Sequence, residues 1–313
     1  MIPVLDNDAV LAAVDAATAI ERTREAFERH ARGEWEMPAK VYLDSPPHGD
    51  FRAMPARGDG LALLKWVTSF PANPERGLPV VAGAVVLSDA SSGALVAILD
   101  CRAVTWLRTG AAAAVSATAL ARDDAASVGI VGCGVNGAWA ARCLSVAGYG
   151  PGVCADVRPE PAHALADELG WKPGSRADAV SQDVVVTMTP GEDPVVHESD
   201  LVPGQHLAVL GADAHGKAEL DPAAIDRCRL FCDEWTQASA GGELAGPVAA
   251  GRVAAGNVTQ LGDVLVGGAE GRRSADEVTL FDSTGLAIQD LAIAAAALEA
   301  WREGRVDAQR IAL

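Results

Sequence analysis

A cluster of glycines within residues 127–144 is the part of the sequence best suited to hold a ligand. The stretch SVGIVGCGVNGAWAARCL contains a short apolar run followed by Gly132, Gly134 and Gly137, in the spacing G-x-G-x-x-G. In such a loop the first glycine allows a tight turn, the second lets the backbone approach a pyrophosphate, and the third lets a helix pack closely on a strand. The free N–H groups at the start of that helix would then face phosphate oxygens. We therefore expect a dinucleotide here, and a glycine-rich turn without a ligand is the alternative.

The identity of the dinucleotide depends on an acidic residue expected about 20 residues after the loop. Asp156, in the stretch GVCADVRPE, meets this expectation. Its carboxylate could accept hydrogen bonds from both hydroxyls of an adenosine ribose, and its charge would repel the 2′-phosphate of NADP. Arg158 could instead attract that phosphate. We therefore favour NAD and keep NADP open.

Four cationic residues before position 109 could hold a substrate carboxylate. Lys65 interrupts an apolar strand at 61–67, so it is either buried with a partner or directed outward to water. Arg108 lies among small residues in TWLRTGAAAA, where its planar guanidinium could bind a carboxylate or simply cover a helix surface. The other two are Lys40 in MPAK and Arg52 in DFRAMPA.

One acidic residue stands where an acid–base group would be needed. Asp213 follows an apolar strand in HLAVLGADAHGKAEL, and ligands of parallel sheets bind beyond the carboxyl ends of the strands. A carboxylate there could act as a general acid or base, although the pattern alone favours a cap or turn aspartate. We interpret His215 and Lys217 as solvent-facing loop residues, and Glu219 and Asp221 as acidic residues at a helix start.

The elements that must position these residues change character along the chain. Residues 6–33 have helical spacing throughout, residues 37–99 alternate as in an antiparallel sheet, and residues 103–122 predict a long helix. Residues 281–304 predict a loop and then a helix. Between these parts, short apolar strands alternate with helices, which indicates a parallel sheet with helices on both faces. The strands are expected at 128–131, 152–155, 183–187, 206–210 and 230–232.

The composition excludes several classes of partner. The formal charge of −17 would repel a nucleic-acid backbone and an anionic membrane surface. We find no apolar run of about 18 residues and no signal peptide, so we expect neither a membrane span nor export. The six cysteines form no C-x-x-C pair, so we expect no metal ion and a cytoplasmic location.

Eight stretches of the sequence together form a pattern that covers nearly the whole chain. In chain order they are FRAMPA, LKWVTSFPANPERGLP, LRTGAAAAVSATALAR, GIVGCGVNG, VVVTMTP, HLAVLGADAHGKAELD, GGEL and TLFDSTGLAIQDLA. With these stretches in this order, the sequence resembles the ornithine cyclodeaminase/μ-crystallin family. Within the family, LRTGAA, GCG, ADVR and FDSTGLAIQD are most similar to the archaeal-type alanine dehydrogenases.

This resemblance implies an α/β protein with two domains. Residues 1–108 with 288–313 would form an α+β domain for substrate binding and dimerisation. Residues 109–287 would form a Rossmann domain with a doubly wound parallel sheet, and the active site would lie in the cleft between the domains. Family dimers join their sheets across the two-fold axis, so we expect a homodimer.

The resemblance also implies residue roles. Lys65 matches the active-site lysine near the substrate carboxylate and imine, Arg108 the arginine that binds the carboxylate, and Asp213 the catalytic aspartate. Thr109 resembles a residue that touches the cofactor phosphates. Lys40 departs from the arginine that relatives often have after MP, and a lysine makes a point-like contact with a carboxylate where an arginine would make a bidentate one. We expect the cofactor to contact Thr109, Gly132, Gly134, Val135, Asn136, Gly137, Asp156, Arg158, Thr187 and Gly211.

The activity implied by this set is a NAD-dependent oxidation at the C–N bond of a small L-amino acid, as in an alanine dehydrogenase. Two other enzymatic readings share the same site: an ornithine cyclodeaminase that forms proline and ammonia, and a reductase of cyclic ketimines. A ligand-binding protein of the μ-crystallin kind, without turnover, is the non-enzymatic alternative.

Overall fold

The chain forms two compact units in the computed structural model, which describes residues 1–191, 193–214 and 216–313. The first unit comprises residues 1–108 and 286–313, and the second comprises residues 109–285. The chain enters the first unit again at residue 286, where the sequence predicted 288. The roles expected for the two units remain predictions. His215 lies outside the described residues.

The first unit begins with two helices, and the prediction of one helix over residues 6–33 was wrong. Helix α1 (Asn7–Ala13) ends before helix α2 (Ala16–Ala31) begins. The break occurs because the side chain of Asp15 accepts a hydrogen bond from the backbone N–H of Thr18, at 2.8 Å, and thereby caps α2.

A seven-stranded sheet forms the body of the first unit. Its strand order is β15-β1-β6-β5-β4-β3-β2. Neighbouring strands are antiparallel except for β1 and β6, so the antiparallel prediction for 37–99 is confirmed. Strands β1 and β15, near the two chain ends, were not predicted. The strands are β1 (Ile2–Leu5), β2 (Val41–Ser45), β3 (Gly49–Gly58), β4 (Leu61–Ser69), β5 (Val81–Asp89), β6 (Leu95–Asp100) and β15 (Gln309–Ile311), with a 3-10 helix η1 (Asn73–Arg76) before β5.

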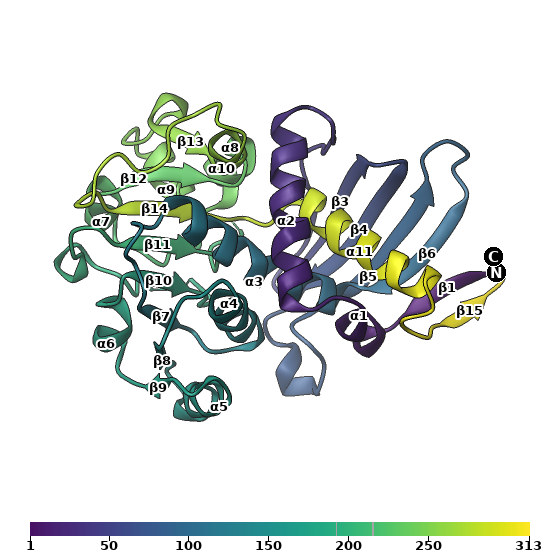
Figure 1. Cartoon of the computed structure of the whole chain (residues 1–313), viewed down its shortest axis with the longest axis horizontal. Helices are drawn as coiled ribbons and strands as arrows, with labels where there is room; N and C mark the ends of the chain where they lie inside the picture. The colour runs from purple at the N-terminus through teal and green to yellow at the C-terminus, as the bar shows by residue number, and fades with distance from the viewer. Residues whose placement is uncertain (192, 215) are drawn as a thin grey trace. The chain divides into compact units, whose positions relative to one another are not determined.

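Helix α11 (Ala287–Arg302) forms the core of the first unit. It packs against β3, β4 and α2, and Figure 1 shows α11 and α2 side by side. A helix that is apolar on nearly all sides is stable only when it is surrounded by protein, and most of α11 is buried. Asp290 is a charged residue within this buried stretch.

The second unit is built on eight parallel strands, and the five predicted strands are all present. The strand order is β13-β12-β14-β11-β10-β7-β8-β9. Residues 281 and 282 belong to β14, so the predicted loop at this position was wrong. The strands are β7 (Val128–Val131), β8 (Gly152–Ala155), β9 (Lys172–Pro173), β10 (Val184–Thr187), β11 (His206–Val209), β12 (Arg229–Cys232), β13 (Val258–Gln260) and β14 (Thr279–Asp282).

Helices cover both faces of this parallel sheet, with α4 and α5 on one face and α6 on the other (Figure 1). The long helix α3 (Cys101–Leu120) contains the boundary between the two units. The remaining helices are α4 (Val135–Val146), α5 (Pro159–Leu169), α6 (Arg176–Val180), α7 (Pro222–Asp226), α8 (Trp235–Gly241), α9 (Ala245–Ala249) and α10 (Leu261–Leu265), with 3-10 helices η2 (Glu198–Asp200) and η3 (Ala255–Asn257).

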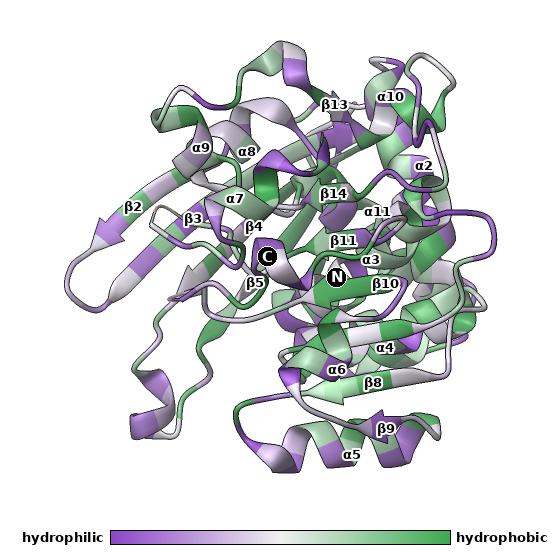
Figure 2. Cartoon of the chain, turned by 90° about the vertical axis from the view of Figure 1, so that its left-hand side faces the viewer, coloured by the Kyte–Doolittle hydropathy of each residue, from purple (hydrophilic) through white to green (hydrophobic). Residues whose placement is uncertain are grey.

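The order of the parallel strands defines where a ligand can bind. The chain runs outward from β7 to β8 and β9, and then returns to β10 on the other side of β7. Strands β7, β10 and β11 are buried along their whole length, and β10 is hydrophobic in Figure 2. In doubly wound sheets the ligand binds at such a reversal, beyond the carboxyl ends of the strands. The predicted Rossmann fold is confirmed.

Two searches of the described residues gave negative results. Within this part of the chain, no helix combines the length and the hydrophobicity that a membrane span requires. Its His, Cys, Asp and Glu side chains form no group of three or more that could hold a metal ion.

Candidate functional site

The glycine loop lies at the strand reversal, and two of its glycines are required by close packing. Gly132 has a φ of +96°, and a Cβ atom there would collide with the carbonyl oxygen of Met188, which follows β10. A Cβ atom at Gly137 would collide with the carbonyl oxygen of Gly132. Both glycines therefore let the loop, the start of α4 and the end of β10 lie close together.

Gly134 differs from these two because, apart from its chain neighbours, no described residue has an atom within 4 Å of the position that its Cβ would take. Gly134 is the N-cap residue of α4, and among the described residues no capping side chain accepts a hydrogen bond from the first N–H groups of this helix. Val135 is half exposed, and the buried Oδ1 of Asn136 has no hydrogen-bond partner among the described residues. Open space, free N–H donors and an unsatisfied polar atom fit the pyrophosphate of a dinucleotide.

Asp156 lies beside this loop at the end of β8. Its Oδ2 accepts the N–H of Cys133 at 2.8 Å, and its Oδ1 accepts the N–H of Arg158 at 2.9 Å. Each oxygen retains a second lone pair, so the carboxylate can still accept from ribose hydroxyls. The Arg158 side chain is 72% exposed, with Nε 4.0 Å from Asp156 Oδ1. The Asp156 carboxylate therefore contacts the glycine loop, whereas the Arg158 side chain extends into solvent. This arrangement favours NAD over NADP, because the negative charge of Asp156 would repel a 2′-phosphate.

Three other predicted cofactor residues are buried. Thr109 lies in α3. The hydroxyl of Thr187 donates to Glu219 Oε2 at 2.8 Å, and the N–H of Gly211 donates to the same oxygen at 2.7 Å. The donors of Thr187 and Gly211 therefore bind protein, and a cofactor could contact only their remaining atoms.

In the first unit, the structure brings Lys65 and Arg108 to one buried carboxylate. Lys65 is 1% exposed, and its Nζ donates to Thr105 Oγ1 at 2.7 Å and to Asp290 Oδ1 at 2.8 Å. The Arg108 side chain is 12% exposed, and its Nε lies 3.5 Å from the same oxygen of Asp290. Of the two alternatives for Lys65, the buried and paired one is correct.

This cluster carries one unbalanced positive charge when its three groups are ionised. Burial lowers the pKa of Lys65, while Asp290 acts in the opposite direction and Arg108 lowers the pKa further. Arg108 Nε and Asp290 Oδ2 are buried without a hydrogen-bond partner among the described residues. Surplus positive charge and an unused N–H donor suit one carboxylate ligand.

The remaining predicted substrate residues lie on β3 and before β2. Arg52 lies on the same face of the sheet as Lys65, since it pairs with Val67 on β4. Its Nε and Nη2 donate to the two oxygens of Asp50 at 2.6 and 3.1 Å, so much of its charge is balanced. Lys40 is half-buried just before β2.

Asp213 lies in the loop after β11 and is not a helix cap. Its Oδ1 accepts from Lys217 Nζ at 2.7 Å, and the two side chains are about one-third exposed. Lys217 is therefore only partly solvent-facing, as one member of an ion pair.

Two acidic residues have roles that the sequence interpretation missed. Asp290 holds Lys65 and Arg108, and the signal in the sequence was an acidic residue in the otherwise apolar first half of a predicted helix. Glu219, interpreted as a helix-start acid, is instead fully buried. Asp221 does cap α7, because it accepts the N–H of Ala224 at 2.7 Å.

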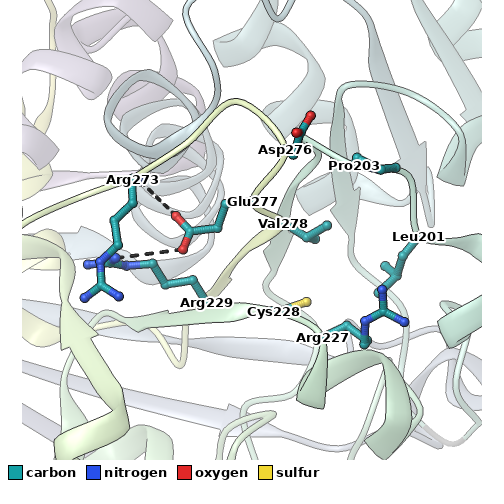
Figure 3. A pocket seen from close by; sticks show the side chains of 9 residues that line it. All are labelled: Leu201, Pro203, Arg227, Cys228, Arg229, Arg273, Asp276, Glu277 and Val278. Atoms are coloured by element: carbon teal, nitrogen blue, oxygen red, sulfur yellow. Dashed lines mark hydrogen bonds and ion pairs between the residues drawn. The ribbon is translucent and has the colours of Figure 1, made fainter.

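A pocket of about 440 Å³ lies at the amino-terminal ends of β11, β12 and β14 (Figure 3). Arg229 and Glu277 form an ion pair there at 3.8 Å, and Glu277 also accepts the N–H of Arg273 at 2.8 Å. Ligands of such sheets bind at the opposite edge, beyond the carboxyl ends. We therefore do not assign the cofactor to this pocket.

The comparisons with known proteins extend over nearly the whole chain. A family model described as ornithine cyclodeaminase/mu-crystallin family matches residues 4–305. Alanine dehydrogenase from Archaeoglobus fulgidus is 38% identical over 298 residues, which cover 93% of this chain and 92% of the relative.

Two solved structures have the same fold. An archaeal alanine dehydrogenase dimer with bound NAD has a TM-score of 0.94 and 35% identity, and the match covers 99% of both chains. The Δ1-pyrroline-2-carboxylate reductase of Thermococcus litoralis, in complex with NADH and L-proline, has a TM-score of 0.93 and 25% identity, over 99% of this chain and 100% of the other. The predicted family, fold class and nicotinamide-dependent enzyme class are therefore confirmed. The chain belongs to the ornithine cyclodeaminase/mu-crystallin family.

Proposed function

We propose that this protein is a NAD-dependent enzyme that converts a small L-amino acid to a 2-oxo acid and ammonia, and that it also catalyses the reverse reaction. The observation that carries the proposal is the buried cluster of Lys65, Arg108 and Asp290, with one surplus positive charge for a single carboxylate. The similarity to alanine dehydrogenase supports the small substrate.

The residues that would hold the cofactor are the glycine loop, the first turn of α4 and Asp156. When bound, NAD⁺ accepts the hydride that leaves the α-carbon of the amino acid. The chain must then bind the substrate, orient that carbon and move protons. Its own polar groups have to carry out these tasks.

Arg108 and Lys65 bind the substrate carboxylate in this proposal. The guanidinium can donate two parallel hydrogen bonds to a carboxylate, and Lys65 adds a point charge. Asp290 raises the pKa of Lys65 against the effect of burial, because an opposite charge nearby favours the charged form. Binding a carboxylate would neutralise the surplus charge of the cluster.

Asp213 would move the protons. Its carboxylate is paired with the ammonium of Lys217 at 2.7 Å. Loss of the hydride from the neutral amine leaves an iminium group, C=NH2⁺. Asp213 accepts a proton from water as the water oxygen bonds to this carbon, and it then passes that proton to the nitrogen. As the C–N bond breaks, the new hydroxyl gives its proton to Asp213 and becomes the carbonyl. One water is consumed, and the products besides reduced cofactor are the 2-oxo acid, ammonia and one proton, which Asp213 releases to solvent.

Reduction of a cyclic imino acid is the second candidate. The similarity to the Δ1-pyrroline-2-carboxylate reductase supports it, and the same cluster would bind the carboxylate of such a substrate. An ornithine cyclodeaminase would also begin with the same hydride transfer, but it returns the hydride within one cycle.

The first experiment measures NADH absorbance with NAD⁺ and a panel of L-amino acids that includes alanine and ornithine, with product analysis in parallel. We expect NADH to accumulate with alanine. Proline formed from ornithine without NADH would instead establish a cyclodeaminase. Oxidation of NADH with a cyclic imine alone would establish the reductase. Cofactor binding without turnover of any of these substrates would favour a ligand-binding protein.

We also propose that the protein is a homodimer, as is the archaeal relative. The edge strand β2 supports this, since it exposes apolar side chains such as Val41 (62%) and Leu43 (59%), and an apolar edge strand needs a cover. Light scattering of the purified protein tests it.

The six unpaired cysteines support a reducing compartment such as the cytoplasm.

A further inference from the structure

The carboxylate of Glu219 joins the two loops that follow β10 and β11. Its Oε1 accepts both the N–H and the hydroxyl of Thr189, at 2.6 and 2.8 Å. Its Oε2 accepts the hydroxyl of Thr187 at 2.8 Å and the N–H of Gly211 at 2.7 Å. Four donors, from the last residue of β10 and from the loops after β10 and β11, therefore converge on one buried group.

The backbone around Glu219 is shaped to admit this carboxylate. A Cβ atom at Gly211 would lie 2.6 Å from Glu219 Oε1 and would collide with the carbonyl oxygen of Thr189. Burial raises the pKa of Glu219, and the hydrogen bonds from Thr189, Thr187 and Gly211 act in the opposite direction. The absence of a side chain at Gly211 thus serves the contact with Glu219.

A second buried carboxylate fixes the backbone of Glu219 itself. Glu243 accepts the N–H of Glu219 through Oε2 and the N–H of Leu220 through Oε1, both at 2.8 Å. Glu243 is also buried. Glu219 is therefore anchored at both its backbone and its side chain.

These contacts enclose the segment that carries Asp213. The bond from the Gly211 N–H to the Glu219 carboxylate closes the segment between residues 211 and 219. Inside it, Asp213 is paired with Lys217. The other loop held by Glu219 follows β10, which adjoins β7 at the strand reversal. Both loops thus lie at the carboxyl edge, where ligands of such sheets bind.

We propose that Glu219 is a positioning residue that holds the Asp213 loop against the loop after β10. The inference rests on the proposed function, because it requires Asp213 to act on the substrate. Glu219 itself touches neither substrate nor cofactor in this account. It acts on turnover through the placement of Asp213.

Glu219→Gln tests the proposal. A carboxylate accepts at both oxygens, whereas an amide accepts at one and donates at the other. In either orientation, the amide nitrogen would face a backbone N–H, that of Thr189 or that of Gly211, which cannot turn away. Misplacement of a catalytic group by about 1 Å can cost about a hundredfold in rate. We expect kcat to fall by about 10- to 100-fold, with a smaller change in the Kd of NADH.

Gln205→Glu is the matched control, because it makes the reverse exchange at the opposite end of β11. The Gln205 amide donates to the carbonyl oxygens of Val180 and Gln182, at 2.8 and 2.9 Å, and is buried. The variant loses these two hydrogen bonds far from Asp213 along the strand. We expect the Tm of Gln205→Glu to fall by about as much as that of Glu219→Gln, while its kcat stays nearly unchanged.

A double variant separates positioning from general destabilisation. If Glu219 acts through Asp213, then Glu219→Gln added to Asp213→Asn should lower kcat little further, because residues that act as a unit are strongly non-additive. Multiplicative losses would overturn the proposal. Should Glu219→Gln fail to fold, Thr189→Val removes only one donor to Oε1, and a fall in kcat of a few fold is expected.

The outcomes distinguish this inference from the proposed function. A wild-type protein that turns over none of the tested amino or imino acids refutes the proposed function, and the role of Glu219 with it. An active wild type whose Glu219→Gln or Thr189→Val variant keeps full kcat refutes the role of Glu219 alone.

Discussion

Replacement of Asp290 by Asn should strongly destabilise the protein, because it leaves two buried cations without their shared anion. Asp290 Oδ1 lies 2.8 Å from Lys65 Nζ. At an effective dielectric constant of about 20, this pair is worth about 6 kcal/mol. Lys65 can limit the loss by releasing its proton. At pH 7 this costs at most about 5 kcal/mol, the value for an ordinary lysine pKa of about 10.4, because burial lowers the pKa of Lys65. We therefore expect a loss of about 3–5 kcal/mol in the free energy of unfolding, as for other broken buried pairs.

The loss should depend on pH in a definite direction. The pKa of Lys65 is already lowered by burial in the wild type, where it is faced by Asp290, Arg108 and Cys101, and it should be lowered further in Asp290→Asn. A lysine with a lowered folded pKa binds fewer protons in the folded state than in the unfolded state, so stability rises with pH up to the unfolded pKa. The difference in the free energy of unfolding between the wild type and Asp290→Asn should therefore become smaller as the pH rises from 7 toward 10.

Urea unfolding of the wild type and the variant at several pH values measures this difference. The control is Lys65→Met combined with Asp290→Leu, which removes both charges of the pair. This double variant should regain part of the lost stability, because apolar replacement of a whole buried pair is often neutral. A deficit below about 1 kcal/mol, or one that does not change with pH, would show that Lys65 is not a buried cation held by Asp290.

Three further predictions concern turnover and the cofactor. Asp213→Asn should lower kcat by about 10²- to 10⁴-fold, as loss of a general base does, and leave the Kd of NADH unchanged; retained turnover would remove Asp213 from the mechanism. Gly137→Ala should lower Tm because its Cβ collides with the carbonyl oxygen of Gly132, whereas Gly134→Ala, which meets no protein atom, should keep Tm and weaken NADH binding in a fluorescence titration. If Gly134→Ala binds NADH as tightly as the wild type, the cofactor does not approach this backbone. Asp156→Ser should improve the Kd of NADPH relative to that of NADH, and an unchanged ratio would refute its role in the choice of cofactor.

The parts of the site that depend on local spacing could be predicted from the sequence. The glycine loop could be predicted because Gly132, Gly134 and Gly137 lie within six residues, between a short apolar strand and a helix. Asp156 could be predicted because it comes directly after the next apolar strand. By contrast, the break between α1 and α2 was missed because the apolar spacing continues across it. Asp15 was the available signal, since aspartate is a preferred N-cap residue.

The pairing of Lys65 and Arg108 with Asp290 could not be predicted because Asp290 is distant from both in sequence. Lys65 and Asp290 are 225 positions apart. The alternation along β4 predicts on which face of the sheet Lys65 lies, but it does not indicate whether a carboxylate packs against that face. Helix α11, far away in the sequence, supplies this carboxylate through Asp290. Similarly, Glu219 receives its hydrogen bonds from positions 187–211, so its neighbours in sequence indicated only a helix start.

Asp290 and Glu219 are both buried carboxylates, but they have different partners and should respond differently to replacement. Asp290 balances two cations, so its loss changes the charge of the cluster and appears in the pH dependence of stability. Glu219 accepts hydrogen bonds from uncharged N–H and O–H groups, so its loss leaves unsatisfied donors and shifts loops without releasing a buried cation. If Glu219→Gln lowered kcat while Asp290→Asn altered mainly the pH-dependent stability and the KM for the amino acid, the two carboxylates would have separate tasks: one would place the proton carrier and the other would set the charge that receives the substrate carboxylate.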